Sequence, residues 1–255
     1  MPRTYRKASA TAPPGYFRWE ACGLRWLDAA GSGLVVEVLE EGPHHLVLPM
    51  LTSAPPTEAA AEQLGRGLAR IHGAGAEAFG CAPDGWSGDG WLGPLREPLP
   101  LRVGAWKAWG PFFAQARVLP LAALGRDRGV FTPADVAGLE RFAGVVADGG
   151  LDTADPPARL HGDLWAGNVM CTAQGAVLID PAAHGGHREA DLAMLQLFGC
   201  PHLDRVLAAY DEAAPLADGW RERVLLHQVH PLLVHAVLFG GSYVGRALDA
   251  ARRYA

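Results

Sequence analysis

The sequence predicts an α+β fold in which a small mixed part, residues 1–50, precedes a mainly helical part, residues 51–255. Short alternating stretches broken by turn residues dominate the first part, whereas helical periodicities dominate the second. A proline-containing stretch, residues 52–56, separates the two and reads as a linker. With 49% hydrophobic and 19% charged residues, the 255-residue chain can bury a substantial core.

In the small part, residues 4–9 read as a strand that carries Lys7. A helix follows Pro13-Pro14-Gly15, because proline is tolerated in a first helical turn, and the glycines at 31–33 end it. Residues 34–39 and 45–48 are predicted as two strands joined by a turn at 41–43.

In the large part, Thr57 is a good cap for a helix over 57–72. Residues 73–100, rich in Gly, Pro and Trp, are predicted as a long structured loop, and strands and turns are expected over 158–183. Further helices are predicted at 104–117, 118–128, 133–147, 188–198, 201–213 and 219–251, and Pro231 should kink the last of them.

Charge and composition exclude several classes of protein. The net charge is −5 with no basic surplus, so we expect no nucleic-acid partner. No run of 18 apolar residues predicts a membrane span, and the start MPRTYRKASA has no apolar signal core, so we expect a cytoplasmic protein. The four cysteines are irregularly spaced, which favours free thiols over a zinc site or disulfides.

Residue scarcity singles out three positions. The chain has 20 Arg but only two Lys, Lys7 and Lys107, and one Asn, Asn168. Lysine and asparagine share A/T-rich codons, which indicates a G/C-rich gene in which Arg replaces Lys wherever charge alone is enough. A retained Lys or Asn is therefore a candidate functional residue.

The sharpest motif is HGDLWAGN at residues 161–168, followed by an apolar run that ends in Asp180. It supplies two carboxylates and one amide, which is the set that phosphoryl transfer from ATP needs. Asp163 would orient the attacking hydroxyl and accept its proton, while Asn168 and Asp180 would hold magnesium. The alternative is a plain turn, since Gly-Asp and Gly-Asn are common turn formers.

Two further segments fit a nucleotide site. Lys7, on a strand, would bind the α- and β-phosphates and pair with Glu20 in the next helix; the alternative is a surface ion pair. The end of the run LVLPML would present main-chain groups to adenine, or would simply be a core strand. Its residues are Pro49, Met50 and Leu51, and because proline has no N–H, the donor would be the N–H of Met50 or Leu51.

Four segments together resemble the fructosamine kinases, also called ketosamine-3-kinases. They are LHGDLWAGN at 160–168, LIDPA at 178–182, GHREADLAM at 186–194 and LFGGSY at 238–243. The resemblance runs from Lys7 onward, and Trp165 and the His-Arg-Glu-Ala-Asp stretch distinguish it from aminoglycoside phosphotransferases and choline kinases.

The resemblance implies a two-lobed protein-kinase-like fold with a small N-lobe and a mainly helical C-lobe. It also implies ATP-dependent, magnesium-dependent phosphorylation of the sugar 3-hydroxyl of ketosamines, either small molecules or glycated proteins. The 3-phosphate makes the adduct fall off, so the activity is a repair of glycation. The alternatives are another small-molecule kinase of the aminoglycoside phosphotransferase type, or a pseudokinase that binds nucleotide without turnover.

Several neighbouring residues are weaker candidates. The resemblance implies positions near the substrate for His187, Arg188 and Glu189, whereas helix capping and solvated charge are the alternative. Asp191 is expected to anchor the catalytic loop, and Trp165 to stack on a sugar or amine or else to pack in the core. Three histidines of the last helix, His227, His230 and His235, are expected to be packed or solvent-facing, with His230 or His235 a candidate border of the substrate pocket.

One feature departs from the family pattern. Family members have a strand, a glycine-rich loop and a second strand before the lysine strand, but only six residues precede Lys7 here. Two strands and a turn need roughly fifteen residues. Either the start codon is misplaced, or another element covers the phosphates, or nucleotide binding is weak.

Overall fold

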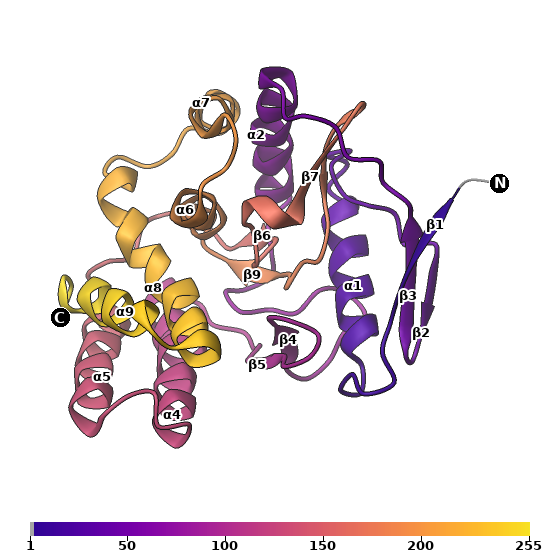
Figure 1. Cartoon of the computed structure of the whole chain (residues 1–255). Helices are drawn as coiled ribbons and strands as arrows, with labels where there is room; N and C mark the ends of the chain where they lie inside the picture. The colour runs from indigo at the N-terminus through magenta and orange to yellow at the C-terminus, as the bar shows by residue number, and fades with distance from the viewer. Residues whose placement is uncertain (1–2) are drawn as a thin grey trace.

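The computed structural model describes residues 3–255. A small sheet and helix α1 (Tyr16–Asp28) stand at one end of the molecule, and helices make up most of the other end (Figure 1). Short strands lie between them, next to α1 on one side and to the helices of the C-terminal half on the other (Figure 1). Mixed helices and sheets confirm the α+β prediction. Within residues 3–255, no helix combines the length and the apolar character needed to cross a bilayer.

The N-terminal sheet has three antiparallel strands in the order β1-β3-β2, where β1 is Thr4–Ala8, β2 is Glu40–Gly42 and β3 is His45–Pro49. Central strand β3 is buried because its apolar side chains face α1, whereas β1 is mostly exposed. The register places Lys7 opposite Leu46. Helix α1 begins after Gly15, whose left-handed backbone (φ 80°) suits glycine.

The strand predicted over 34–39 does not form. Leu34 instead packs into the core formed with helix α2 (Glu58–Gly73), beside Leu64 and Leu68. Its carbonyl accepts a hydrogen bond from the N–H of Leu178 at 2.7 Å, in a single parallel bridge. Burial of Leu34 against residues distant in the sequence therefore outweighs the local alternation of apolar and polar residues. The short strand forms later in the chain, as β2. The boundary predicted at residue 50 stays a prediction, because this segment contributes to the core of the large part.

The predicted helices largely form, with changed limits. Thr57 caps α2 by accepting a hydrogen bond from the N–H of Ala60, and Thr132 caps α5 with Asp135 in a reciprocal capping box. A π-helical turn lies between α3 and α4, inside the region predicted as two helices. The bounds are α3 Trp109–Phe112, the π-helix Phe113–Val118, α4 Leu119–Asp127, α5 Pro133–Ala147, α6 Glu189–Phe198, α7 Leu203–Ala213, α8 Trp220–Phe239 and α9 Ser242–Arg252.

The last predicted helix is two helices, and the break is not at the proline. Helix α8 (Trp220–Phe239) continues without a break through Pro231, which lies in its interior. The chain turns instead at Gly240 and Gly241, which have φ of 63° and 60°. Residues with side chains rarely adopt this conformation, so the glycine pair ends α8 and starts α9.

The remaining strands form three antiparallel pairs. Strand β4 (Gly90–Leu92) pairs with β5 (Leu99–Leu101) inside the segment predicted as a loop. Strand β6 (Ala158–Leu160) pairs with β9 (His184–Gly186), and β7 (Val169–Thr172) pairs with β8 (Gly175–Leu178). A single 3₁₀ turn, Ala166–Asn168, leads into β7. The β6–β9 and β7–β8 pairs carry the HGDLWAGN loop and the segment around Asp180.

Gly65 tests the close packing of α2 on α7. A Cβ atom at this position would lie 2.3 Å from the carbonyl oxygen of Val206, so Gly65→Ala must push the two helices apart. We expect a loss of about 1–3 kcal/mol in the free energy of unfolding. Gly73→Ala, on the same helix and with open space around the new Cβ, is the matched control and should stabilise by less than about 1 kcal/mol. Equal denaturation midpoints for the two variants would contradict this packing.

Candidate active site

The loop that follows β6, residues 161–168, is called the catalytic loop below, and one buried carboxylate binds its backbone. Asp191, in the first turn of α6, accepts hydrogen bonds from the backbone N–H groups of His161 (2.7 Å) and Gly162 (3.0 Å). His72 of α2 lies 3.2 Å away through its Nε2. Burial alone would raise the pKa of Asp191, but His72 and the loop N–H groups outweigh it and lower that pKa. The carboxylate is therefore ionised and fixes the loop backbone.

Asp163 and Asn168 face each other across this loop. The Asn168 side-chain nitrogen donates to the carbonyl oxygen of Asp163 at 2.8 Å and to its carboxylate at 3.2 Å. The amide oxygen of Asn168 consequently points away from Asp163. Burial raises the pKa of Asp163 to about 6, against the hydrogen bond from Asn168 and with a contribution from Asp180.

Lys7 joins three elements at the base of the cleft. Its Nζ lies 2.8 Å from Glu20 on α1 and 3.2 Å from Asp180, which follows β8. Burial by itself would lower the pKa of Lys7, but the two carboxylates outweigh it and hold that pKa above its ordinary value. Burial raises the pKa of Glu20, and Lys7 limits that rise. The backbone of Asp180 is left-handed (φ 53°), which turns its half-exposed carboxylate toward Lys7.

One cleft of about 440 Å³ is lined by all five of the side chains Lys7, Glu20, Asp163, Asn168 and Asp180. Its donor set also fits a magnesium ion. The amide oxygen of Asn168 and the carboxylate of Asp180 are both oxygen ligands of the kind Mg²⁺ prefers. Among the described residues of the lining there is no thiol, and the imidazole present is that of His235 on α8.

Exposed aromatic side chains also line the cleft. Trp165, with 43% of its surface exposed, projects from the catalytic loop, and Phe239, 52% exposed, comes from α8. His235 donates from Nδ1 to the carbonyl of Pro231 at 2.8 Å, which leaves Nε2 as a hydrogen-bond acceptor when the ring is neutral. Burial lowers the pKa of His235 and so favours the neutral form. Of the two histidines proposed to border the pocket, His235 is the one that lines this cleft.

Sequence reasoning missed two parts of the lining. Tyr16, at the start of α1, packs its ring 5.8 Å from the Lys7 ammonium. The turn between β4 and β5, residues 93–96, closes one side of the cleft and brings in Arg96. The proline–glycine start of α1 was a usable signal for Tyr16, whereas the hairpin had none, because its strands are only three residues long.

The proposed adenine run lies at the end of β3 and does not line this cleft. The N–H of Met50 donates to the carbonyl of Arg3 at 2.9 Å, so it already serves the sheet. The N–H of Leu51 is the remaining candidate donor to adenine, and the carbonyl oxygen of Pro49 is the candidate acceptor. The adenine contact stays a prediction, narrowed to these two residues.

His187 and Arg188 bond within the protein and lie outside the lining of this cleft, so their expected place near the substrate stays a prediction. His187 is buried, accepts from the N–H of Glu189 at 3.2 Å and meets the Thr153 hydroxyl at 2.8 Å through Nε2. Arg188 binds Asp155 at 2.9 Å. Neither residue lines the cleft. Their side chains instead tie the start of α6 to the segment before β6.

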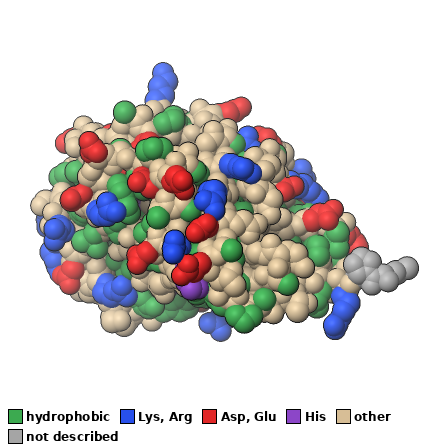
Figure 2. Space-filling model, turned by 90° about the horizontal axis from the view of Figure 1, so that it is seen from above, with side chains coloured by type: hydrophobic (Ala, Val, Ile, Leu, Met, Phe, Trp, Pro, Cys, Tyr) green, Lys and Arg blue, Asp and Glu red, His purple; other side chains and the backbone are tan. Residues whose placement is uncertain are grey.

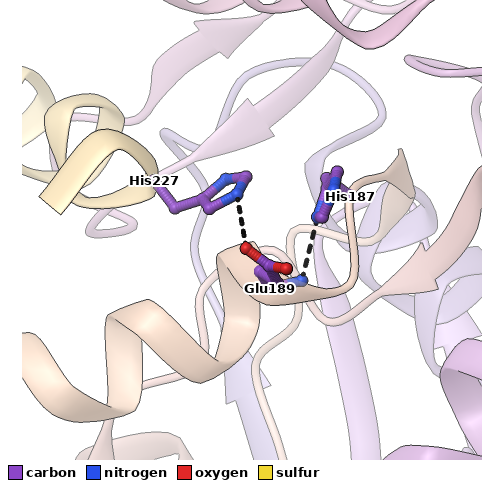
Figure 3. A group of neighbouring side chains, drawn as sticks. All are labelled: His187, Glu189 and His227. Atoms are coloured by element: carbon purple, nitrogen blue, oxygen red, sulfur yellow. Dashed lines mark hydrogen bonds and ion pairs between the residues drawn. The ribbon is translucent and has the colours of Figure 1, made fainter. Parts of the chain in front are cut away.

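The expected place of Glu189 near the substrate also stays a prediction, because Glu189 too bonds within the protein and does not line the cleft. Its carboxylate receives two hydrogen bonds from Arg223, at 2.5 and 2.9 Å, and lies 3.3 Å from His227 (Figure 3). His187, Glu189 and His227 have ligand-type atoms within 4.8 Å of one another. Because Arg223 occupies the carboxylate and both His187 nitrogens have partners, the group is a structural network and not a metal centre.

The sequence is similar to known kinases along nearly its whole length. A sequence model of the family described as fructosamine kinase matches residues 3–254. A probable ketoamine kinase of Thermus thermophilus is 36% identical over 249 residues, which are 96% of this chain and 86% of that protein. A probable ketoamine kinase of Synechocystis is 31% identical over 237 residues, 91% of this chain and 76% of that protein.

Solved structures agree. A crystal structure assigned as a fructosamine-3-kinase from Thermobifida fusca superposes with a TM-score of 0.89 and 48% identity, covering 98% of this chain and 85% of that one. A choline kinase of Streptococcus pneumoniae, 16% identical, superposes with a TM-score of 0.64 over 99% of this chain and 87% of its own, which shows the shared protein-kinase-like fold. The chain belongs to the fructosamine kinase family and is an ATP-dependent phosphotransferase that acts on a sugar hydroxyl.

Proposed function

We propose that this protein transfers the γ-phosphoryl group of ATP to the 3-hydroxyl of ketosamines, the fructosamine or ribulosamine adducts of amines, and thereby initiates deglycation. The observation that carries the proposal is the meeting of Lys7, Glu20 and Asp180 with Asp163 and Asn168 in one cleft. The proposed acceptors are small ketosamines and ketosamine groups on glycated proteins.

In this proposal Asp163 accepts the proton. The acceptor hydroxyl would form its new O–P bond to the γ-phosphorus while the bond from that phosphorus to ADP breaks, and its proton would pass to Asp163. The pKa of about 6 suits this task, because the carboxylate is ionised at neutral pH yet more basic than an exposed aspartate. Asn168 keeps it oriented through the 3.2 Å hydrogen bond.

The nucleotide phosphates would be held by Lys7 and a metal ion. Glu20 and Asp180 take two of the three ammonium hydrogens, which leaves the third for a phosphate oxygen. Asn168 and Asp180 would hold Mg²⁺, which neutralises phosphate charge when bound. Figure 2 shows acidic and basic side chains interspersed on the face that it draws, without a large patch of one sign.

At the acceptor end, Trp165 offers a flat exposed surface to a sugar or amine, and His235 offers an acceptor nitrogen. The direct test is ADP formation with a ribulosyl- or fructosyl-lysine derivative, with and without magnesium. Lysine and sorbitol, which lack the ketosamine linkage, are the controls. We expect ADP only when the ketosamine and magnesium are both present. ATP·Mg binding without any ADP formation would instead indicate a pseudokinase.

Replacement of Asp163 by asparagine tests the proton acceptor. Asp163→Asn keeps the size of the side chain and an oxygen that can accept from Asn168, but it cannot take a proton. We expect turnover to fall by a factor of about 10² or more, with the melting temperature nearly unchanged. Turnover near that of the original protein, in a variant of normal stability, would exclude Asp163 as the base.

Replacement of Lys7 tests the phosphate site. Lys7→Ala should raise the dissociation constant of ATP·Mg strongly, and Lys7→Arg should restore little, because a planar guanidinium does not fit between Glu20 and Asp180 as a point charge does. Calorimetric titration measures both. Lys107→Arg, which changes the other, exposed lysine, is the matched control. If Lys7→Arg and Lys107→Arg bind nucleotide equally well, Lys7 is a replaceable charge.

Asp191 is proposed as a positioning residue that acts through the loop backbone. Asp191→Asn replaces one accepting oxygen by an NH₂ group facing backbone donors, so we expect a loss of about 2–4 kcal/mol in unfolding free energy. Asp127→Asn, at an exposed ion pair, should change it by less than about 1 kcal/mol.

The pH dependence gives Asp191 a second readout. Because the folded pKa of Asp191 lies below its unfolded value of about 3.9, its contribution is present above that pH and is lost as the pH falls through the folded pKa. The stability difference between Asp191→Asn and the original protein should therefore shrink below about pH 4. A difference that stays constant down to pH 2 would mean that the ionised carboxylate is not what holds the loop.

A further inference from the structure

Arg117 is a buried cation without a counter-charge. It lies in the π-helix Phe113–Val118 with 2% of its surface exposed. Its Nη1 donates to the carbonyl oxygens of Arg102 (2.8 Å) and Ala116 (3.0 Å), whereas Nη2 has no hydrogen-bond partner among residues 3–255. No carboxylate of the described chain forms an ion pair with it.

Such an arrangement is costly unless something compensates it. Guanidinium does not lose its proton in proteins, and an uncompensated charge in the interior costs several kcal/mol. The Phe112 ring, 4.6 Å from the guanidinium carbon, supplies a cation–π contact but no negative charge. Burial lowers the pKa of Arg117 to about 9, and exposed Asp89 is the carboxylate that opposes this. Arg117 therefore remains charged at neutral pH.

A small cavity of about 40 Å³ lies beside this side chain. One water molecule needs roughly 10–15 Å³ by this measure, so the cavity has room for a larger particle. Its polar lining includes His184, whose Nδ1 donates to the carbonyl of Ala182, together with His187, His227 and His230. Nδ1 of His227 has no hydrogen-bond partner among residues 3–255. The wall toward the active site is Gly162, and the remaining lining is mostly aromatic and aliphatic.

The charge of the lining favours an anion. Asp191 is the acidic residue of the wall, and its oxygens already accept from three donors, His161, Gly162 and His72. The pKa values of His184 and His230 are lowered first by burial and then by Arg117, which indicates a positive local potential. π-Helical turns also occur frequently at functional sites, and this one places Arg117.

We propose that the cavity binds one monovalent anion of chloride size, held by Nη2 of Arg117 behind the catalytic loop. The anion would supply the missing counter-charge and join the π-helix to Gly162 and to the base of α6. The site is separate from the cleft of the proposed kinase reaction and does not depend on that reaction.

Two measurements on the whole protein test this. In the first, thermal unfolding is followed in sodium chloride and in sodium gluconate at equal ionic strength. We expect chloride to raise the melting temperature by roughly 5–11 °C at a hundredfold excess over its dissociation constant. Arg117→Met should lose the difference between the salts, and Arg126→Met, at an exposed arginine of α4, should keep it.

In the second, crystals of the unmodified protein are soaked in bromide, so the result does not depend on the folding of a variant. We expect an anomalous peak in the cavity within hydrogen-bond distance of Arg117 Nη2. An empty or water-filled cavity in bromide, equal melting temperatures in the two salts, or a chloride effect that persists in Arg117→Met would each overturn the proposal.

Discussion

The ammonium of Lys7 is the interaction on which the cleft depends. It bridges β1, α1 and the segment after β8 through Glu20 and Asp180, at 2.8 and 3.2 Å. The Lys7 and Glu20 side chains are largely buried, so the pair is protected from solvent screening, whereas Asp180 keeps an exposed face toward the cleft. The positive charge of Lys7 thus holds the Asp180 carboxylate at the cleft and connects β1 and α1 to the segment after β8.

A second buried charge works from the opposite side. Asp191 holds the backbone at His161 and Gly162, so Asp163 and Asn168 project from a loop whose base cannot shift. The cleft lies between these two anchors, with the aromatic side chains of α8 and the catalytic loop at its open end. Behind the loop, Arg117 adds a third buried charge, beside the cavity that Gly162 also lines. Electrostatic forces as well as packing therefore act on this face of the loop.

The sequence predicted the chemical centre better than its surroundings. Asp163, Asn168 and Asp180 lie close together in the chain, so their spacing alone limits their geometry, and the scarcity of lysine marked Lys7. Where distant packing decides, prediction was weaker. Leu34 is drawn into the core against α2, and His187 to Glu189 turn toward Thr153 and Arg223, contacts that no local pattern encodes. The glycine pair that begins at Gly240 was a visible signal for the break between α8 and α9. The kink was instead predicted at Pro231, because proline is the stronger helix breaker in a sequence.

The central claim is that Asn168 and Asp180 form a metal–nucleotide site next to Lys7. A crystal grown with Mn²⁺ and a non-hydrolysable ATP analogue tests it most directly, because manganese scatters anomalously and accepts the same oxygen ligands as magnesium. The account predicts an anomalous peak bound by the amide oxygen of Asn168 and the carboxylate of Asp180, with analogue phosphates within reach of Lys7 Nζ. A nucleotide bound elsewhere, or manganese that avoids both residues while the analogue is present, would contradict it.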